Sequence, residues 1–305
     1  MQLGMIGLGK MGGNMARRLR RAGVDVVGYD RDAADLRRLV EDCGVSAADS
    51  PEHLVQSLTA PRIVWLMLPA GNVTGQYVDT LAGLLGDGDV LVDGANSYYK
   101  DSMHRAAALE SAGIHLVDAG VSGGVWGLDE GYALMLGGPD GAIDRLRPVI
   151  EALAPGASRG WIHAGPSGSG HFVKMIHNGI EYGMMQAYAE GFSLLRGRED
   201  FGLDLAGIAE TWRHGSVVRS WLLDLTADVL RGDQELTDVE PFVADSGEGR
   251  WTAVEGIEQG VPTPVMSTAL MTRFASQGKQ DYADKLLAML RNRFGGHAVG
   301  RGDAP

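Results

Sequence analysis

With 305 residues, of which 45% are hydrophobic and 22% charged, the chain has the composition of a globular protein and the length of two domains. Its formal net charge of -12 argues against nucleic-acid binding, because neutralising phosphates requires a surplus of Lys and Arg. The sequence shows neither a signal peptide nor the roughly 18 apolar residues that span a bilayer, and its single cysteine, Cys43, has no partners at metal-ligand spacing. We therefore expect a cytoplasmic protein that binds no membrane, no nucleic acid and no metal.

Residues 1–163 alternate short apolar runs with amphipathic stretches. Strands that are buried on both faces are apolar throughout, so this alternation predicts an α/β domain with a Rossmann-type, doubly wound parallel sheet. The predicted strands are Leu3–Ile6, Val24–Gly28, Ile63–Leu68, Val90–Val92, Ile114–Val117, Leu134–Leu136 and Trp161–Ile162.

Residues 164–295 lose the strand-like runs and consist largely of helix formers, which predicts a second, all-α domain. The stretch His171–Leu195 has apolar residues at helical spacing and no proline. It indicates one helix of about 37 Å, with Ser167 or Ser169 as its N-terminal cap. Further helices are predicted at Ala206–Arg213, Val218–Leu230, Thr252–Gln259, Thr263–Gln277 and Tyr282–Phe294. Residues 296–305 are expected to form a disordered tail.

A G-x-G-x-x-G motif lies between the first predicted strand and a helix with Met15, Leu19 and Ala22 on its apolar face. The first glycine permits a tight turn, the second lets the backbone approach a pyrophosphate, and the third lets helix and strand pack closely. The motif therefore predicts a dinucleotide site. Its predicted cofactor-binding residues are Gly7, Leu8, Gly9, Lys10, Met11 and Gly12.

The second predicted strand leads into Asp30 and Arg31. A carboxylate about 20 residues beyond the glycines accepts hydrogen bonds from the adenosine ribose and repels a 2′-phosphate, which favours NAD. Arg31 can instead hold a 2′-phosphate or stack on adenine, so NADP is the alternative cofactor. Leu68, Pro69 and Ala70, at the end of the third predicted strand, are expected to lie over the cofactor.

Four polar residues, Lys174, His177, Asn178 and Glu181, share one face of the predicted long helix. Their positions place them within about 10 Å of one another along the helix axis. A solvated helix face is the alternative interpretation. However, the segment begins with Gly168-Ser169-Gly170, which leaves the backbone bare, and it directly follows a dinucleotide domain. Clefts beside such domains commonly bind substrates.

The stretch GHFVKMIHNGIEYG, residues 170–183, resembles the signature of the 6-phosphogluconate dehydrogenases. Asp93-Gly94-Ala95-Asn96-Ser97 and Gly120-Val121-Ser122-Gly123-Gly124 also resemble stretches of that family, and the resemblance covers residues 1–275. It implies an enzyme that oxidises 6-phospho-D-gluconate with NAD and decarboxylates it to D-ribulose 5-phosphate.

The resemblance also implies residue roles. Lys174 would be the base that takes the hydroxyl proton and later returns a proton to the carbonyl oxygen. Glu181 would be the acid that protonates carbon 1 of the enediol. The implied substrate-binding residues are Asn96, Ser122, Gly123, Gly124, His177, Asn178, Tyr182 and Arg273, with Asn96 also beside the cofactor.

One departure from the family pattern concerns the substrate phosphate. Larger family members carry a Lys and a Thr where this chain has Ser246 and Glu248, and a carboxylate repels a phosphate. Either Arg250 and Arg273 bind the phosphate instead, or the substrate is not phosphorylated. Further candidate cations, supplied by a second subunit, are Arg291, Arg293, His297 and Arg301.

Two other functions are compatible with the sequence. One is a non-decarboxylating NAD-dependent 3-hydroxyacid dehydrogenase acting on an unphosphorylated sugar acid or a related acid, which Glu248 favours and Glu181 opposes. The other is a non-catalytic NAD-sensing protein, which the joint presence of Lys174, Asn178 and Glu181 opposes.

The resemblance further implies self-association through the helical domain, as a homodimer or homotetramer. Two tryptophans of that domain, Trp212 and Trp221, would suit a large buried interface.

Overall fold

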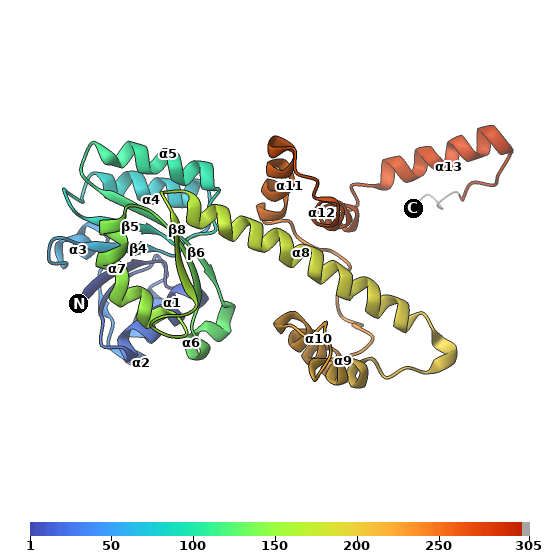
Figure 1. The fold of residues 1–305 in the computed structure, drawn as a ribbon, viewed down its shortest axis with the longest axis horizontal. Helices are drawn as coiled ribbons and strands as arrows, with labels where there is room; N and C mark the ends of the chain where they lie inside the picture. Colours follow the sequence, from blue (N-terminus) through green and yellow to red (C-terminus); the bar gives the residue numbers. More distant parts are fainter. Residues whose placement is uncertain (301–305) are drawn as a thin grey trace. The chain divides into compact units, whose positions relative to one another are not determined.

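The computed structural model describes residues 1–300, which divide into one unit up to His177 and a second unit from Asn178 onward. Figure 1 shows the sheet with its helices in the first unit and the helices of the second. This arrangement confirms the predicted fold class, a Rossmann-type domain followed by a helical one. The domain boundary predicted after residue 163 stays a prediction. Residues 301–305, the second half of the predicted tail, lie outside the described residues.

The sheet has the strand order β3-β2-β1-β4-β5-β6-β7-β8. Its strands are β1 (Gln2–Ile6), β2 (Asp25–Tyr29), β3 (Ser46–Ala47), β4 (Ile63–Leu66), β5 (Val90–Asp93), β6 (His115–Ser122), β7 (Ala133–Gly137) and β8 (Trp161–Gly165).

All neighbouring strands pair in parallel except β6 and β7, which are antiparallel. The expectation of a wholly parallel sheet is therefore wrong at this pair. Only residues 123–132 join the two strands, whereas a parallel crossover needs roughly a dozen residues or more.

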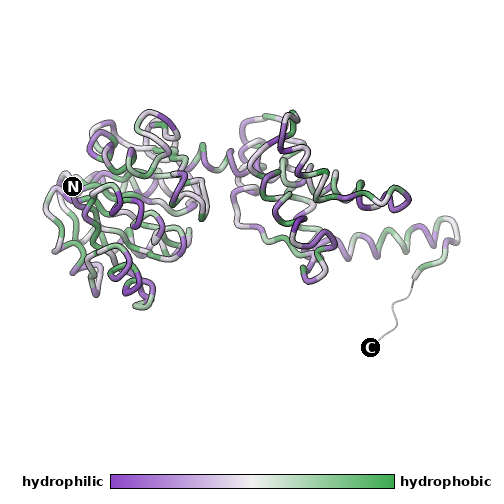
Figure 2. Tube along the Cα trace, turned by 90° about the horizontal axis from the view of Figure 1, so that it is seen from below, coloured by the Kyte–Doolittle hydropathy of each residue, from purple (hydrophilic) through white to green (hydrophobic). Residues whose placement is uncertain are grey.

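Two apolar cores cover the two faces of the sheet, and Figure 2 shows its hydrophobic strands between more hydrophilic outer segments. Neighbouring residues of one strand alternate between the cores: Met5 belongs to the first and Ile6 to the second. This alternation explains why the strands read as continuous apolar runs. The first core packs against α1 (Lys10–Arg21), α2 (Ala33–Cys43) and α7 (Asp140–Leu153), and the second against α3 (Pro51–Gln56), α4 (Asn72–Ala82) and α5 (Tyr99–Glu110).

The strand bounds differ from the prediction at several places, and the largest extension is in β6, which runs to Ser122 instead of ending at Val117. The two-residue strand β3 was not predicted because both residues are exposed and form no apolar run. The third predicted strand ends at Leu66 instead of Leu68, so Met67 and Leu68 belong to the loop that follows β4.

Helix α8 (Ser169–Arg196) begins in the first unit and continues into the second. Its last turns pack with α9 (Leu205–Arg213) and α10 (Trp221–Gly232) around Phe192. In the same unit Tyr182 packs with α11 (Glu248–Gln259) and α12 (Pro264–Ser276), whereas α13 (Asp281–Gly295) buries no residue. No helix within residues 1–300 has both the length and the apolarity to cross a membrane.

All predicted helices of the second domain are present, with shifted ends. The helix predicted from Val218 begins at Trp221, because the Ser220 hydroxyl accepts a hydrogen bond from the Leu223 amide at 3.2 Å and caps the helix there. The helix predicted from Thr252 begins earlier, at Glu248.

Candidate active site

The loop between β1 and α1 has the geometry of a dinucleotide cradle. Gly7 has a φ of +92°, and a Cβ at this residue would lie 2.3 Å from the carbonyl oxygen of Met67. A Cβ on Gly12 would lie 1.9 Å from the carbonyl oxygen of Gly7, whereas nothing lies within 4 Å of the corresponding position on Gly9. No side chain caps the N-terminus of α1, and its first turn holds no acidic residue. The open side of Gly9 and this helix end therefore suit a pyrophosphate.

Asp30 follows β2 and is fixed beside the glycine loop. Its Oδ2 accepts a hydrogen bond from the Leu8 amide at 2.5 Å, and its Oδ1 accepts one from the Asp32 amide at 2.8 Å. Each carboxylate oxygen can accept a second hydrogen bond, which a ribose hydroxyl can supply. The neighbouring Arg31 is exposed.

The Ser122-Gly123-Gly124 turn lies at the same edge of the sheet as the dinucleotide loop. Gly123 and Gly124 have φ values of +142° and +53°, which favour glycine. The carbonyl oxygen of the next residue, Val125, accepts a hydrogen bond at 3.3 Å from the Asn14 amide group of α1. The residue after the turn thus contacts the helix that follows the glycine motif.

Lys174 is buried, with 6% of its surface exposed, because α8 approaches β6 very closely. A Cβ on Gly120 of β6 would lie 2.4 Å from the Cβ of Lys174. The Nδ1 atom of His177 lies 3.5 Å from Lys174 Nζ, and its Nε2 atom lies 3.4 Å from the Ser122 hydroxyl. Lys174, His177 and Ser122 thus form one connected polar group in the first unit.

The four polar residues on one face of α8, Lys174, His177, Asn178 and Glu181, form the polar stripe of this helix. The stripe is not a solvated helix face. Lys174 and Asn178 are buried, and Glu181 is half-buried. In contrast, the apolar residues Val173 and Ile180 are 38% and 52% exposed. The usual amphipathic pattern, with apolar residues inside and polar residues outside, is therefore inverted along this part of the helix.

Asp118 of β6 caps α8, a role that the sequence analysis assigned to a serine. Its buried carboxylate accepts hydrogen bonds from the Gly168 amide at 2.5 Å and the His171 amide at 2.7 Å. Burial raises the pKa of the Asp118 carboxyl above its ordinary value, while nearby His171 and the two backbone donors act in the opposite direction.

The predicted serine caps are wrong for a steric reason: the start of α8 packs on the sheet, where a strand residue reaches the helix end. Ser167 donates its hydroxyl to the carbonyl oxygen of Leu116 at 3.1 Å, and the Ser169 hydroxyl makes no hydrogen bond. The signal that was missed is a charged residue, Asp118, inside an otherwise apolar strand.

A second polar group lies within the second unit, around Tyr182. Its hydroxyl is 3.3 Å from the hydroxyl of Ser246, which in turn donates to the Glu248 carboxylate at 2.5 Å. The Arg273 guanidinium lies 3.5 Å from the centroid of the Tyr182 ring and donates to the carbonyl oxygen of Ala244 at 3.0 Å. Arg273 thus contacts the ring of Tyr182, whereas Glu248 is linked to the Tyr182 hydroxyl through Ser246.

Arg250, the other cation considered for the phosphate, is engaged elsewhere. Its Nε atom lies 3.2 Å from the carboxylate of Asp245, and its guanidinium lies 5.3 Å from the centroid of the Phe274 ring. Of the two arginines, Arg273 is thus the one that contacts Tyr182.

A glycine cradle for a dinucleotide, a carboxylate after β2 and a buried lysine on the helix that leaves the sheet define a nicotinamide-dependent dehydrogenase. Comparison with known proteins gives the family. Residues 2–164 match the family described as the NAD binding domain of 6-phosphogluconate dehydrogenase, and residues 170–300 match the C-terminal domain of 6-phosphogluconate dehydrogenase. The chain belongs to the 6-phosphogluconate dehydrogenase family.

Individual relatives agree with this assignment. The chain is 45% identical over 305 residues to the NAD(+)-dependent, decarboxylating 6-phosphogluconate dehydrogenase of Haloferax volcanii, covering 99% of this chain and 100% of that protein. It is 40% identical to a putative 6-phosphogluconate dehydrogenase of Bacillus subtilis, covering 98% and 99% of the two chains. Among solved structures, that of Plasmodium falciparum 6-phosphogluconate dehydrogenase matches with a TM-score of 0.84 and 28% identity, covering 100% of this chain and 67% of that one. The predicted family and its NAD-binding domain are confirmed, while the preference for NAD over NADP and the roles of single site residues stay predictions.

Proposed function

We propose that the protein catalyses the oxidative decarboxylation of 6-phospho-D-gluconate to D-ribulose 5-phosphate and carbon dioxide, with reduction of NAD. The observation that carries this proposal is Lys174, a buried residue whose amine lies 3.5 Å from Nδ1 of His177 and which shares a helix with Glu181. The Haloferax volcanii relative, which matches over its whole length, is named for this NAD(+)-dependent decarboxylating activity.

Bound NAD supplies the hydride acceptor, and the chain's own residues move the protons. Lys174, in its neutral form, accepts the proton of the 3-hydroxyl group as the hydride leaves carbon 3. After carbon dioxide departs, protonated Lys174 donates to the oxygen at carbon 3, which yields an enediol. Glu181 then protonates the carbon that lost carbon dioxide, and Lys174 takes back the enediol proton. The product is the ketopentose.

Further polar residues orient the substrate in this proposal. Ser122 and the amides of Gly123 and Gly124 bind the carboxylate, as suits a turn that presents backbone N–H groups. Asn96 and Asn178 bind hydroxyl groups. His177, placed between Ser122 and Lys174, binds the sugar chain next to the reacting carbon.

Arg273 is our proposed ligand for the substrate phosphate, together with the Tyr182 hydroxyl. The guanidinium is held against the Tyr182 ring, and an arginine fork suits a phosphate. Glu248, which is 3% exposed, opposes this assignment by its charge and supports the second candidate, an unphosphorylated hydroxyacid substrate. The hydrogen bond from Ser246 to Glu248 partly offsets that charge.

One assay distinguishes the two substrates and the two cofactors. NADH appearance at about 340 nm is measured with 6-phosphogluconate and with gluconate, and carbon dioxide release is measured in parallel. We expect turnover and carbon dioxide release with 6-phosphogluconate and NAD, and lower kcat/KM with NADP because Asp30 repels the 2′-phosphate. Activity on gluconate alone would move the assignment to an unphosphorylated hydroxyacid. NADP turnover equal to that with NAD would contradict the role of Asp30.

We also propose that the protein self-associates, as a dimer in the simplest case and a tetramer otherwise. Helix α8 exposes Val173 and Ile180, and α13 buries nothing and leaves Phe294 98% exposed. In Figure 2 α13 alternates between hydrophilic and hydrophobic segments. Trp221 is also exposed, whereas Trp212 packs on Phe192 within its own unit. Monomers rarely leave so much apolar surface uncovered.

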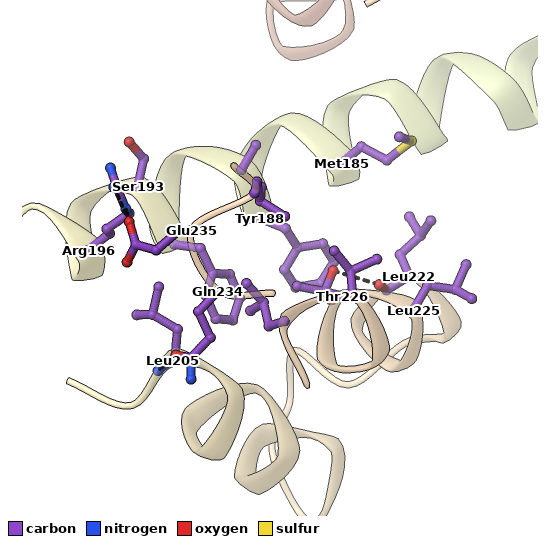
Figure 3. Close-up of a pocket in the computed structure, with 15 residues that line it drawn as sticks. Met185, Tyr188, Ser193, Arg196, Leu205, Leu222, Leu225, Thr226, Gln234 and Glu235 are labelled. Carbon is purple, nitrogen blue, oxygen red and sulfur yellow. Dashed lines mark hydrogen bonds and ion pairs between the residues drawn. The ribbon is translucent and has the colours of Figure 1, made fainter. Parts of the chain in front are cut away.

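An apolar hollow of about 500 Å³ adds to this surface. Figure 3 shows it between Tyr188 of α8 and Leu222 and Leu225 of α10, with the Arg196–Glu235 ion pair at one end. Light scattering at micromolar concentration should give at least twice the mass of one chain, and the mass of a single chain would contradict the proposal.

The cytoplasmic localisation expected from the sequence is also a proposal.

A further inference from the structure

Two loops of the proposed site follow neighbouring strands, β4 and β5, and one arginine joins them. Arg105 of α5 donates through Nη1 to the Asp93 carboxylate at 2.9 Å and to the Ser97 hydroxyl at 3.3 Å. Its Nη2 donates to the carbonyl oxygen of Gly71 at 3.4 Å. Gly71 directly follows Leu68, Pro69 and Ala70, which are expected over the cofactor, and residues 94–97 carry Asn96. One guanidinium therefore connects the cofactor loop to the substrate loop.

Asp93, at the end of β5, is the acceptor that organises the substrate loop. It is fully buried and accepts hydrogen bonds from the Ala95 amide at 3.1 Å, the Ser97 hydroxyl at 2.9 Å and Arg105. Ala95 and Ser97, the two neighbours of Asn96 in the sequence, are therefore both hydrogen-bonded to the Asp93 carboxylate. Because a charged acceptor with three donors resists rearrangement, the orientation of Asn96 depends on this group.

The same helix, α5, also holds the start of α8. The Ser102 hydroxyl lies 2.7 Å from Nδ1 of His171, and both residues are buried. One turn earlier, the Tyr99 ring packs edge-on against Phe172 at 5.1 Å between centroids. Helix α5 thus contacts the segment that leads to Lys174 as well as the two loops.

We propose that Arg105 is a positioning residue that sets the geometry between the cofactor loop and Asn96. It acts through those loops, without itself touching the substrate. A lysine replaces it only in part, because a single ammonium cannot span a carboxylate and a carbonyl oxygen as the planar fork of arginine does. The catalytic part of this inference rests on the proposed function, whereas its effect on cofactor binding does not.

The chain contains a matched control, Arg62. This residue lies just before β4, at the end of the strands opposite to the site loops, and its Nη1 atom lies 3.0 Å from the buried carboxylate of Asp89, just before β5. The Arg62→Met and Arg105→Met substitutions each remove one ion pair to a buried aspartate at an end of β5. Only the second changes the site loops.

We expect Arg105→Met to lower kcat by about ten- to a hundredfold and to raise KM for NAD, since small displacements of positioning groups have effects of that size. Arg105→Lys should fall in between, and Arg62→Met should match the wild-type kcat and KM within about twofold even if both proteins unfold at lower temperature. Equal kinetic effects of Arg62→Met and Arg105→Met would overturn the proposal, because both would then report general destabilisation.

A double substitution tests whether Arg105 acts through Asn96. In an Asn96→Ala background, Arg105→Met should lower kcat much less than it does in the wild type, whereas a fully additive loss would overturn the proposal.

Calorimetric titration with NAD alone is a second test, and its result does not depend on which substrate the protein uses. Weaker NAD binding in Arg105→Met but not in Arg62→Met is expected even if 6-phosphogluconate turns out not to be the substrate. Unchanged NAD binding in Arg105→Met would show that Arg105 does not act through the cofactor loop.

Discussion

Replacing Lys174 with methionine is expected to lower kcat by about 10²- to 10⁴-fold, the usual contribution of a general acid–base group. Methionine matches the length of lysine and tolerates a buried position, so packing against Gly120 is retained while the amine is lost. Without the amine, the 3-hydroxyl proton has no acceptor, and hydride transfer itself is blocked. Rapid mixing with saturating NAD should therefore show no fast NADH formation in the first turnover.

Glu181→Gln provides a contrast, because its proposed role comes after hydride transfer. We expect a rapid burst of about one NADH per active site, followed by slow turnover as the enediol waits for a proton.

The surface lysine Lys100, replaced by methionine in the same way as Lys174, serves as the control for the Lys174→Met substitution and should leave kcat unchanged. A Lys174→Met enzyme that kept a tenth of the activity would exclude Lys174 as the base.

The parts of the structure that the sequence predicted best are those with local causes. The glycine cradle depends on residues next to one another, and the strands read directly from continuous apolar runs. The Lys174–Glu181 stripe follows from helical spacing alone. The burial of that stripe could not be predicted, because it depends on the close contact between Gly120 and Lys174, which are far apart in the sequence.

The residues that were missed act through contacts between distant segments. Asp118 bonds to the amide of His171, 53 positions away, and Arg105 to the carbonyl of Gly71, 34 positions away. Neither belongs to a local motif, and an isolated Asp or Arg usually lies on a solvated face. Only a charge within an apolar strand marks Asp118, and nothing in the local sequence marks Arg105. The antiparallel direction of β7 has a different, local cause: residues 123–132 are too few for a parallel crossover.

Gly120→Ala should reduce both stability and activity, because this glycine is where α8 rests on β6. The added Cβ would lie 2.4 Å from Lys174 Cβ and 3.1 Å from the carbonyl oxygen of Gly170, so the helix start must move. Overpacking of this kind costs about 1–3 kcal/mol, and each kcal/mol lowers Tm by about 2–4 °C in a domain of this size. Gly141→Ala in α7 is the matched control, since nothing lies within 4 Å of its Cβ position, and it should leave Tm unchanged or slightly higher. Thermal unfolding and NADH formation measured on both variants test this contact. If Gly120→Ala behaved like Gly141→Ala in both measurements, the close contact between α8 and β6 would not be what holds Lys174 in place.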